Sequence, residues 1–416
     1  MSHKCGSVAV LLGLILTAAL YGQKKADFSR FVVAGDSLSA GYQNSQLIES
    51  GQVHGYANVI ATQAGVSLKL PLLPPPGYPQ ISIEQNYAVV TGLTPVARLN
   101  RQQTLDVAVP GFSVADLVGL RPSCNPDPTN PIAVMAAEIL KPNCSTNPGT
   151  ELQVAAALRP TTAILWIGSN DALFSLLFNN TDPTDVSTFS GYYHSAATTM
   201  AGASEHLVMA NIPDVTLTAY LTSVPKLAAI LGRSGPEVEA EFGLGSDDMV
   251  TPYAFPFIQA MQAAGSFAPL PDSVPQGPIV IRTTRLAQIR AAVIGYNDVI
   301  ASEAAANGAT LVDIYSLIND LAAHGAKVGG QTLTTDFAGG LFSLDGVHPT
   351  NTGYAIIANE FIKTMNAPPL LAHIPYVDVE QVTKTDPLIF SENDHGKHTG
   401  HVSVGMADGL RVLGRR

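Results

Sequence analysis

The feature that most constrains this fold is a short apolar run that ends in a glycine, an acid and a serine. Residues 31–34 are all apolar, and Gly35, Asp36 and Ser37 follow them directly. An apolar run of this length, bounded by a turn signal, is typical of a buried strand. We predict that Ser37 lies where this strand ends and a helix begins. Backbone amides at a helix start have no intrahelical partner and can hold an anion.

Patterns of strand and helix alternate along most of the chain. Segment 66–70 is a candidate for one strand of the sheet. Five further core strands are predicted to end near Gly35, Val109, Ile167, Ile212 and Ile314. Alternation of this kind indicates a parallel sheet covered by helices on both faces. Functional groups in such sheets gather at the carboxyl ends of the strands.

Size and charge narrow the classes of function. The 416 residues suffice for one elaborated domain or for two. The net charge of −11 comes without any concentrated basic segment, which argues against a nucleic-acid partner. An acidic surface also argues against docking on anionic membranes by charge alone. The sequence does not indicate an oligomeric state.

The N-terminus has the pattern of a secretory signal peptide. An apolar run over residues 8–20 follows a short polar start and is too short for a comfortable membrane span. We predict a signal peptide over residues 1–22, cut near Ala19 or Gly22, with an uncleaved anchor helix as the alternative. The mature chain is then secreted or periplasmic and has no stable membrane span.

The chain has three cysteines, and removal of the signal peptide removes Cys5. Cys124 and Cys144 both lie in segments rich in proline and asparagine. Two cysteines in an exported chain favour one disulfide that closes a loop. Two unpaired thiols are the alternative that the sequence leaves open.

Four sequence blocks carry the chemistry. A lone Gly-Asp-Ser-Leu is weak evidence for a nucleophilic serine, because such a serine is more often a helix cap or a turn residue. Three later blocks accompany it: VPGFS at 109–113, WIGSND at 166–171 and DGVHP at 345–349. With these, the chain resembles the GDSL family of lipases and esterases, also called SGNH hydrolases. The blocks stand in the family's order from Ser37 to His348, so the resemblance covers most of the chain.

The resemblance implies a three-layer α/β/α sandwich with a flavodoxin-like parallel sheet of about five strands. We assign the hydrolase domain to residues 28–366, with an insertion at about 215–283. Residues 367–416 fit the core poorly and are predicted to form a partly disordered extension. Its segment 392–401 contains three histidines, and we interpret it as a solvated tail rather than a metal site.

The blocks also assign roles to residues. Ser37 is the expected nucleophile and His348 the expected base. Asp345, three positions before His348, can accept the imidazole Nδ1–H and fix its tautomer. The resemblance implies that the oxyanion donors are the Ser37 N–H, the Gly111 N–H and the side-chain amide of Asn170. We predict no metal and no cofactor, because no cluster of Cys, His and Asp has metal-ligand spacing.

The predicted function is hydrolysis of a carboxylic ester of a small molecule or a lipid. The Gly-x-Ser-x-Gly elbow of α/β-hydrolases is absent, because position 39 is serine. An enzyme that deacetylates glycans and a non-catalytic binding module are the two alternatives. The aromatic segment 243–271 is either a cap that receives an acyl chain or the packed core of the insertion itself.

Overall fold

The computed structural model describes residues 26–84, 87–100, 102–140, 149–389 and 400–414. The predicted signal peptide, Cys144 and nearly all of the polar segment 392–401 lie outside these residues. No helix within the described ranges is both long and apolar enough to cross a bilayer.

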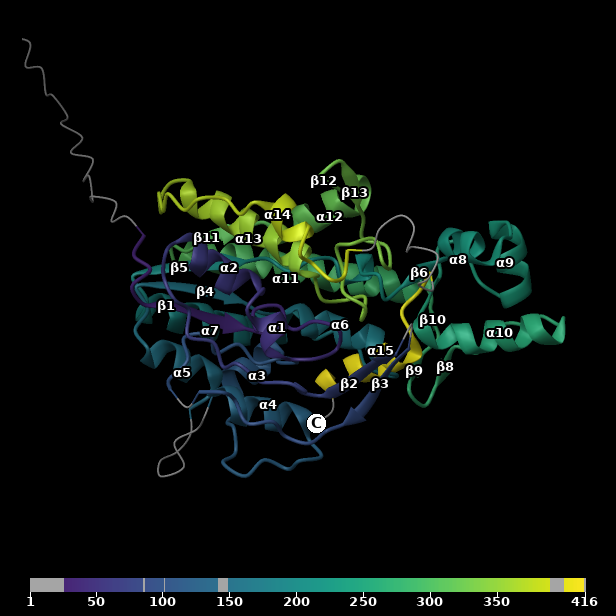
Figure 1. Cartoon of the computed structure of the whole chain (residues 1–416), viewed down its shortest axis with the longest axis horizontal. Coiled ribbons are helices and arrows are strands. Elements are labelled where there is room, and N and C mark those ends of the chain that lie inside the picture. The colour runs from purple at the N-terminus through teal and green to yellow at the C-terminus, as the bar shows by residue number, and fades with distance from the viewer. Residues whose placement is uncertain (1–25, 85–86, 101, 141–148, 390–399, 415–416) are drawn as a thin grey trace, which may run out of the picture.

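The centre of the fold is a four-stranded parallel sheet in the order β1-β4-β5-β11 (Figure 1). Residues of β1 alternate between two apolar clusters, with Val32 and Ala34 in one and Phe31 and Val33 in the other. This alternation places a buried layer on each face of the sheet, as predicted. The strands are β1 (Phe31–Gly35), β4 (Thr162–Trp166), β5 (His206–Ala210) and β11 (Thr310–Val312).

The predicted strand that ends near Val109 is not a regular strand. It runs parallel beside β1 through a bridge between Val33 and Asp106 and a 3.1 Å hydrogen bond from the Val109 amide to the Gly35 carbonyl. The Val107 amide also donates to the Val33 carbonyl at 2.9 Å, and the Asp106 side chain accepts the Ala108 amide, at 3.1 Å. The regular sheet therefore has four strands, not about five. With this segment included, the strand order is that of flavodoxin-like sheets.

Segment 66–70 is not a strand either. It has no regular sheet partner among the described residues, although the Lys69 carbonyl accepts the Leu105 amide at 2.9 Å. The segment is therefore a loop that supports the irregular edge beside β1.

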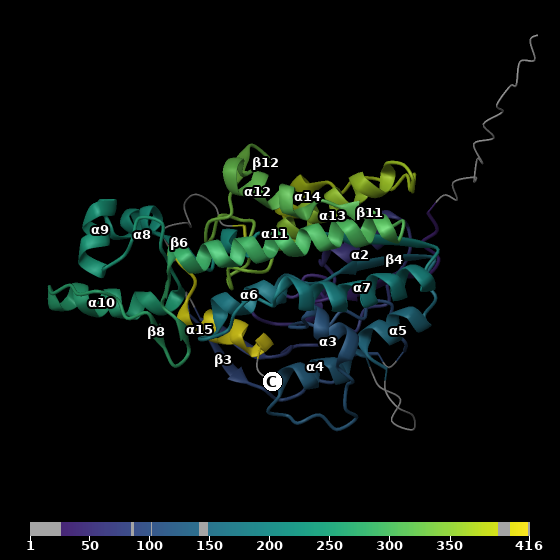
Figure 2. The same cartoon turned by 180° about the vertical axis from the view of Figure 1, so that it is seen from behind.

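Helices cover both faces of the sheet, as Figures 1 and 2 show from opposite sides. The apolar cluster that contains Val32 includes, among others, residues of a first group of four helices, and the cluster that contains Val33 includes residues of a second group of two, besides Ile314. These two layers and the sheet make the predicted α/β/α sandwich. The first group is α3 (Val114–Gly119), α5 (Glu151–Ala157), α7 (Val186–Ala203) and α11 (Thr283–Ala306), and the second is α2 (Tyr56–Gln63) and α13 (Asn351–Asn366).

Shorter elements complete the described chain. The helices are α1 (Glu49–Gln52), α4 (Pro131–Leu140), α6 (Ser169–Leu177), α12 (Ile314–His324) and α14 (Val379–Thr383), with a 3-10 turn η1 (Val215–Leu217). The strand pairs are β2 (Gln80–Glu84) with β3 (Tyr87–Gly92), β8 (Ser273–Val274) with β9 (Gly277–Pro278), and β12 (Ala326–Val328) with β13 (Gln331–Leu333).

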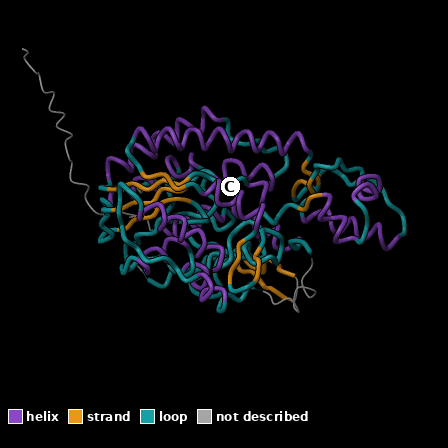
Figure 3. Tube along the Cα trace, turned by 90° about the horizontal axis from the view of Figure 1, so that it is seen from above, coloured by secondary structure: helices purple, strands orange, loops and turns teal. Residues whose placement is uncertain are grey.

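The insertion projects from one end of the α/β body, and the core strands lie toward the other end (Figure 3). The rings of Phe242 and Phe267 meet edge to face at 5.8 Å within the insertion. Tyr253 and Phe255 contact the end of the chain instead, since the Tyr253 hydroxyl donates to Asp408 at 2.8 Å and the Phe255 ring stacks on His401. The aromatic residues therefore pack partly within the insertion and partly against the end of the described chain. The elements are α8 (Val224–Leu231), α9 (Gly235–Phe242), η2 (Pro252–Ala254), α10 (Phe255–Ala264) and the small sheet of β6 (Thr222–Ser223), β7 (Met249–Val250) and β10 (Val280–Ile281).

The end of the described chain returns to the body of the domain. It forms α15 (Val404–Leu410) and η4 (Arg411–Gly414). Leu410 and Leu413 are fully buried in the main apolar cluster, and the Ser45 hydroxyl donates to the Met406 carbonyl at 2.9 Å. This part of the predicted extension is therefore packed against the hydrolase core.

Candidate active site

The turn that carries Ser37 follows β1 directly. The Asp36 carboxylate accepts the Leu38 amide at 3.0 Å, and its carbonyl accepts the Ala40 amide at 3.0 Å. Asp36 thus stabilises the turn through hydrogen bonds to its backbone amides. The predicted helix after Ser37 is absent, because the Tyr42 amide closes back on the Ser37 carbonyl at 3.0 Å and makes a turn.

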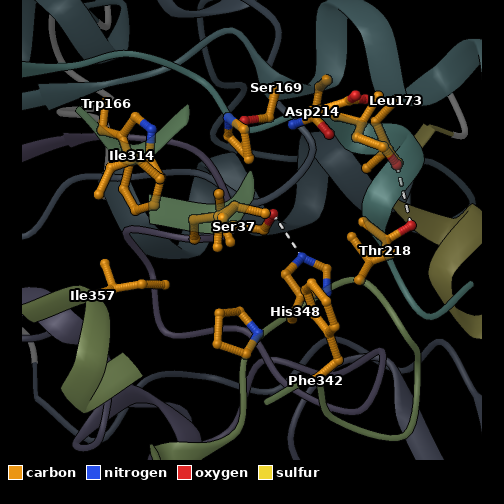
Figure 4. Close-up of a pocket in the computed structure, with 17 residues that line it drawn as sticks. Ser37, Trp166, Ser169, Leu173, Asp214, Thr218, Ile314, Phe342, His348 and Ile357 are labelled. Atoms are coloured by element: carbon orange, nitrogen blue, oxygen red, sulfur yellow. Dashed lines mark hydrogen bonds between the residues drawn. The ribbon is translucent and has the colours of Figure 1, made fainter. Parts of the chain in front are cut away.

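Ser37, His348 and Asp345 form one chain of hydrogen bonds. The imidazole Nε2 lies 2.8 Å from the Ser37 hydroxyl (Figure 4). On the other side of the ring, Nδ1 lies 2.9 Å from a carboxylate oxygen of Asp345. A carboxylate only accepts, so Nδ1 carries the proton and Nε2 accepts from the serine hydroxyl. The imidazole is 1% exposed, which shields both bonds from water.

Asp345 is held in its ionised form by the groups around it. Burial alone would raise its pKa, but the charge of His348, together with hydrogen bonds from the His348 side chain and amide and from the Ser45 amide, lowers the pKa below its usual value. The Ser45 amide donates at 2.7 Å to the same oxygen that faces the imidazole. An ionised Asp345 can stabilise the imidazolium that forms during catalysis.

Two residues around this chain did not emerge from the sequence as site residues. Ser45 fixes Asp345 through its amide, and the ring of Tyr42 lies 4.7 Å from the imidazole of His348. Tyr42 ends the same sequence stretch that contains Ser37, and this position is the only signal that points to it. Ser45 acts through its backbone, which its residue type does not reveal.

Gly111 and Asn170 lie on neighbouring loops at the carboxyl edge of the sheet. Asn170 is in the first turn of α6, and its side-chain amide donates to the Phe112 carbonyl at 2.9 Å. Asp171 accepts the Val114 amide at 3.0 Å and links the same two loops. Asn170 keeps a second N–H that this bond does not use.

The position of Gly111 requires a glycine. Its φ is +83°, and a Cβ there would lie 2.3 Å from the Leu413 carbonyl oxygen. Among the described residues, the amides of Ser37 and Gly111 donate to no backbone acceptor. Both donors are thus free for a ligand.

A small apolar cavity of about 50 Å³ opens beside the serine. Ser37, Asn170 and His348 all line it, while Gly111 does not and is connected to it through the Phe112 carbonyl. Figure 4 shows the cavity between the end of the sheet and the loop that carries His348. Its apolar lining comes mainly from Leu38, Trp166, Leu173, Val215, Ile314, Ile318, Phe342, Val347 and Ile357.

The sequence pattern of GDSL-like Lipase/Acylhydrolase proteins matches residues 31–361. This chain belongs to the GDSL-like lipase/acylhydrolase family. Membership makes this GDSL protein a carboxylic ester hydrolase in general terms. Comparison with curated protein sequences gave no significant match.

Similar solved structures include three hydrolases. LAE5, an α/β hydrolase from the metagenome of Lake Arreo, is 12% identical with a TM-score of 0.38, covering 83% of this chain and 98% of its own. Axe2, an acetylxylan esterase from Geobacillus stearothermophilus, is 13% identical with a TM-score of 0.38, covering 82% and 97%. Phospholipase A1 from Streptomyces albidoflavus NA297 is 13% identical with a TM-score of 0.31, covering 81% and 97%.

Proposed function

We propose that this GDSL protein hydrolyses carboxylic esters through an acyl-enzyme on Ser37. The observation that carries the proposal is the hydrogen-bond chain from Asp345 through His348 to Ser37, which lies at the wall of an apolar cavity. A nucleophile, a base within hydrogen-bond reach and a group that orients the base are the parts that acyl transfer needs.

The reaction follows from the positions of these atoms. The Ser37 oxygen attacks the ester carbonyl carbon while Nε2 of His348 takes the hydroxyl proton. Asp345 stabilises the imidazolium, which then gives its proton to the departing alcohol oxygen. A water molecule, deprotonated by the same nitrogen, attacks the acyl-enzyme and releases the acid. Serine and imidazole end in their starting states.

The oxyanion is stabilised by three donors in this proposal. They are the Ser37 and Gly111 amides and the free N–H of the Asn170 side chain. Among the described residues, neither backbone amide donates a hydrogen bond to a backbone carbonyl. The Asn170 side chain is already oriented by its hydrogen bond to the Phe112 carbonyl. Donors fixed before the reaction cost no reorganisation when the negative charge develops.

The cavity beside Ser37 supports an apolar acyl group in the substrate. Side chains such as Leu173 and Ile318 line it, and burial of each methylene there gains about 0.8 kcal/mol. This lining favours fatty esters over the acetylated glycans that the sequence leaves open.

We further propose, from the predicted signal peptide, that the mature enzyme acts outside the cytoplasm.

A labelling experiment tests the proposal. Wild-type protein is treated with a fluorophosphonate, and the modified peptide is identified by mass spectrometry. We expect one adduct, on Ser37, with loss of hydrolysis of p-nitrophenyl esters. An adduct on another serine, or hydrolysis that survives complete modification of Ser37, would contradict the assignment.

A further inference from the structure

A carboxyl group lies buried directly behind the turn of the nucleophile. Glu151, the first residue of α5, has no exposed surface, and its Oε1 accepts the Gly35 amide at 2.7 Å. Gly35 ends β1, two positions before Ser37. Burial of a carboxyl group is costly, so a buried one is retained where its hydrogen bonds compensate that cost.

Gly35 connects this carboxyl group to the loop that carries Gly111, the other backbone donor proposed for the oxyanion. Its carbonyl accepts the Val109 amide at 3.1 Å, and Val109 precedes Gly111 by two positions. Among the described residues, Glu151 contacts this pair through Oε1 alone, since its buried Oε2 has no hydrogen-bond partner. Ser37 and Gly111 are therefore each two residues from one partner of the Gly35–Val109 hydrogen bond, and Glu151 accepts the amide of the Gly35 partner.

The surroundings of Glu151 favour its neutral form. Burial raises its pKa well above the usual value, and the nearby carboxyl groups of Asp106 and Asp36 raise it further, against the lowering by the hydrogen bond from the Gly35 amide. Among the described residues, no Lys or Arg side chain forms a hydrogen bond or an ion pair with any of the three acids. The contact with Gly35 thus depends on an oxygen acceptor at this position and not on a negative charge.

We propose that Glu151 is a positioning residue for the oxyanion hole. By accepting the Gly35 amide it fixes the Gly35–Val109 pair, and with it the Ser37 and Gly111 amides relative to one another. It touches no reacting atom itself. The inference rests on the proposed function, because it assigns a role to donors that act on the ester carbonyl.

Three substitutions separate positioning from stability. Glu151→Leu removes the acceptor but keeps the side-chain bulk, whereas Glu151→Gln keeps an oxygen for the Gly35 amide. Leu152→Ala is the matched control, because Leu152 is 4% exposed in the same helix and packs in the apolar core. Each variant is assayed for kcat and KM on p-nitrophenyl esters, for its rate of reaction with a fluorophosphonate, and for its melting temperature.

The expected pattern is specific to positioning. Glu151→Leu should lower kcat about 100-fold, as removal of an oxyanion donor does, with KM within about threefold. It should slow phosphonylation to a similar degree, because that adduct is also a tetrahedral anion. Glu151→Gln should keep kcat within about fivefold. Leu152→Ala should lower the melting temperature and leave kcat unchanged.

The opposite results are equally clear. Glu151→Leu with wild-type kcat, or Glu151→Gln as inactive as Glu151→Leu, would overturn the role of Glu151. If Glu151→Leu does not fold, Glu151→Asp replaces it, because the shorter side chain withdraws the oxygen from Gly35. A kcat of Glu151→Asp equal to that of Glu151→Gln would then reject the proposal. Ser37→Ala is assayed in parallel, since activity in that variant would reject the proposed function instead.

Discussion

Ser37 and His348 are separated by 311 positions in the sequence, yet their Oγ and Nε2 atoms lie 2.8 Å apart. Ser37 comes from the turn after β1, and His348 comes from the loop before α13. Asp345 stands only three positions before His348 and meets its other nitrogen at 2.9 Å. The acid and base therefore form a local pair that the fold carries as a unit to a distant serine.

The first prediction concerns this contact. Ser37→Ala should abolish ester hydrolysis without loss of the fold. Ser39→Ala is the matched control, because the Ser39 hydroxyl is bonded to that of Tyr56 at 2.9 Å and not to the imidazole. Ester assays and circular dichroism measure both effects. Equal activities of the two variants would refute the role of Ser37.

Asp345→Asn should lower kcat by about 10⁴-fold, because an amide presents a donor to Nδ1 and favours the wrong imidazole tautomer. The Ser45 amide, which donates to the same oxygen of Asp345, would then also face a donor. Steady-state kinetics and a thermal melt measure the change. A loss of less than tenfold in folded protein would show that Asp345 does not set the tautomer.

The third prediction is a shift in acyl-chain preference. Ile318→Trp should fill the cavity and lower kcat/KM for long-chain esters about tenfold or more relative to acetate esters. Ile294→Trp is the control, because this isoleucine is 51% exposed on α11 and does not line the cavity. A series of p-nitrophenyl esters gives the ratio. The same ratio in both variants would exclude this cavity as the acyl site.

Gly111→Ala should reduce both activity and stability. The positive φ costs an alanine about 1–3 kcal/mol, and its Cβ would collide with the Leu413 carbonyl. Gly119→Ala in α3 is the control, because a Cβ there meets nothing within 4 Å. Urea unfolding and ester assays compare them. Gly111→Ala with wild-type kcat would remove Gly111 from the oxyanion hole.

Stability should fall as the pH rises from about 4 to 8 on account of two buried acids. Burial raises the pKa of Asp36 to about 7 and that of Asp106 to about 8. In this window the folded protein keeps protons that the unfolded chain has lost, so the free energy of unfolding decreases with pH. Asp106→Asn cannot ionise and should show a shallower decrease in urea titrations. A slope identical to wild type would contradict the assignment.

The predicted disulfide remains to be tested, because Cys144 lies outside the described residues. We expect denatured mature protein to show two more free thiols with reductant than without it. Equal thiol counts would exclude the bridge.

Local patterns account for what could be predicted. The ends of β1 and β4 and the helix at 56–63 follow from apolar runs and turn residues near them in sequence. The pairing of Asp345 with His348 follows from their spacing. The segment expected to form a strand before Val109 lies beside β1 but makes only an isolated bridge, at Asp106, and not a regular strand.

The sequence by itself determined the family and most of the order of strands and helices, and it supplied the residues that we propose for acyl transfer, because these depend on residue type and short spacing. Only the tertiary structure decided that Glu151 lies behind the nucleophile and that Leu413 packs on Gly111. Those contacts join segments far apart in the chain, and their geometry is set by how the layers pack on the sheet.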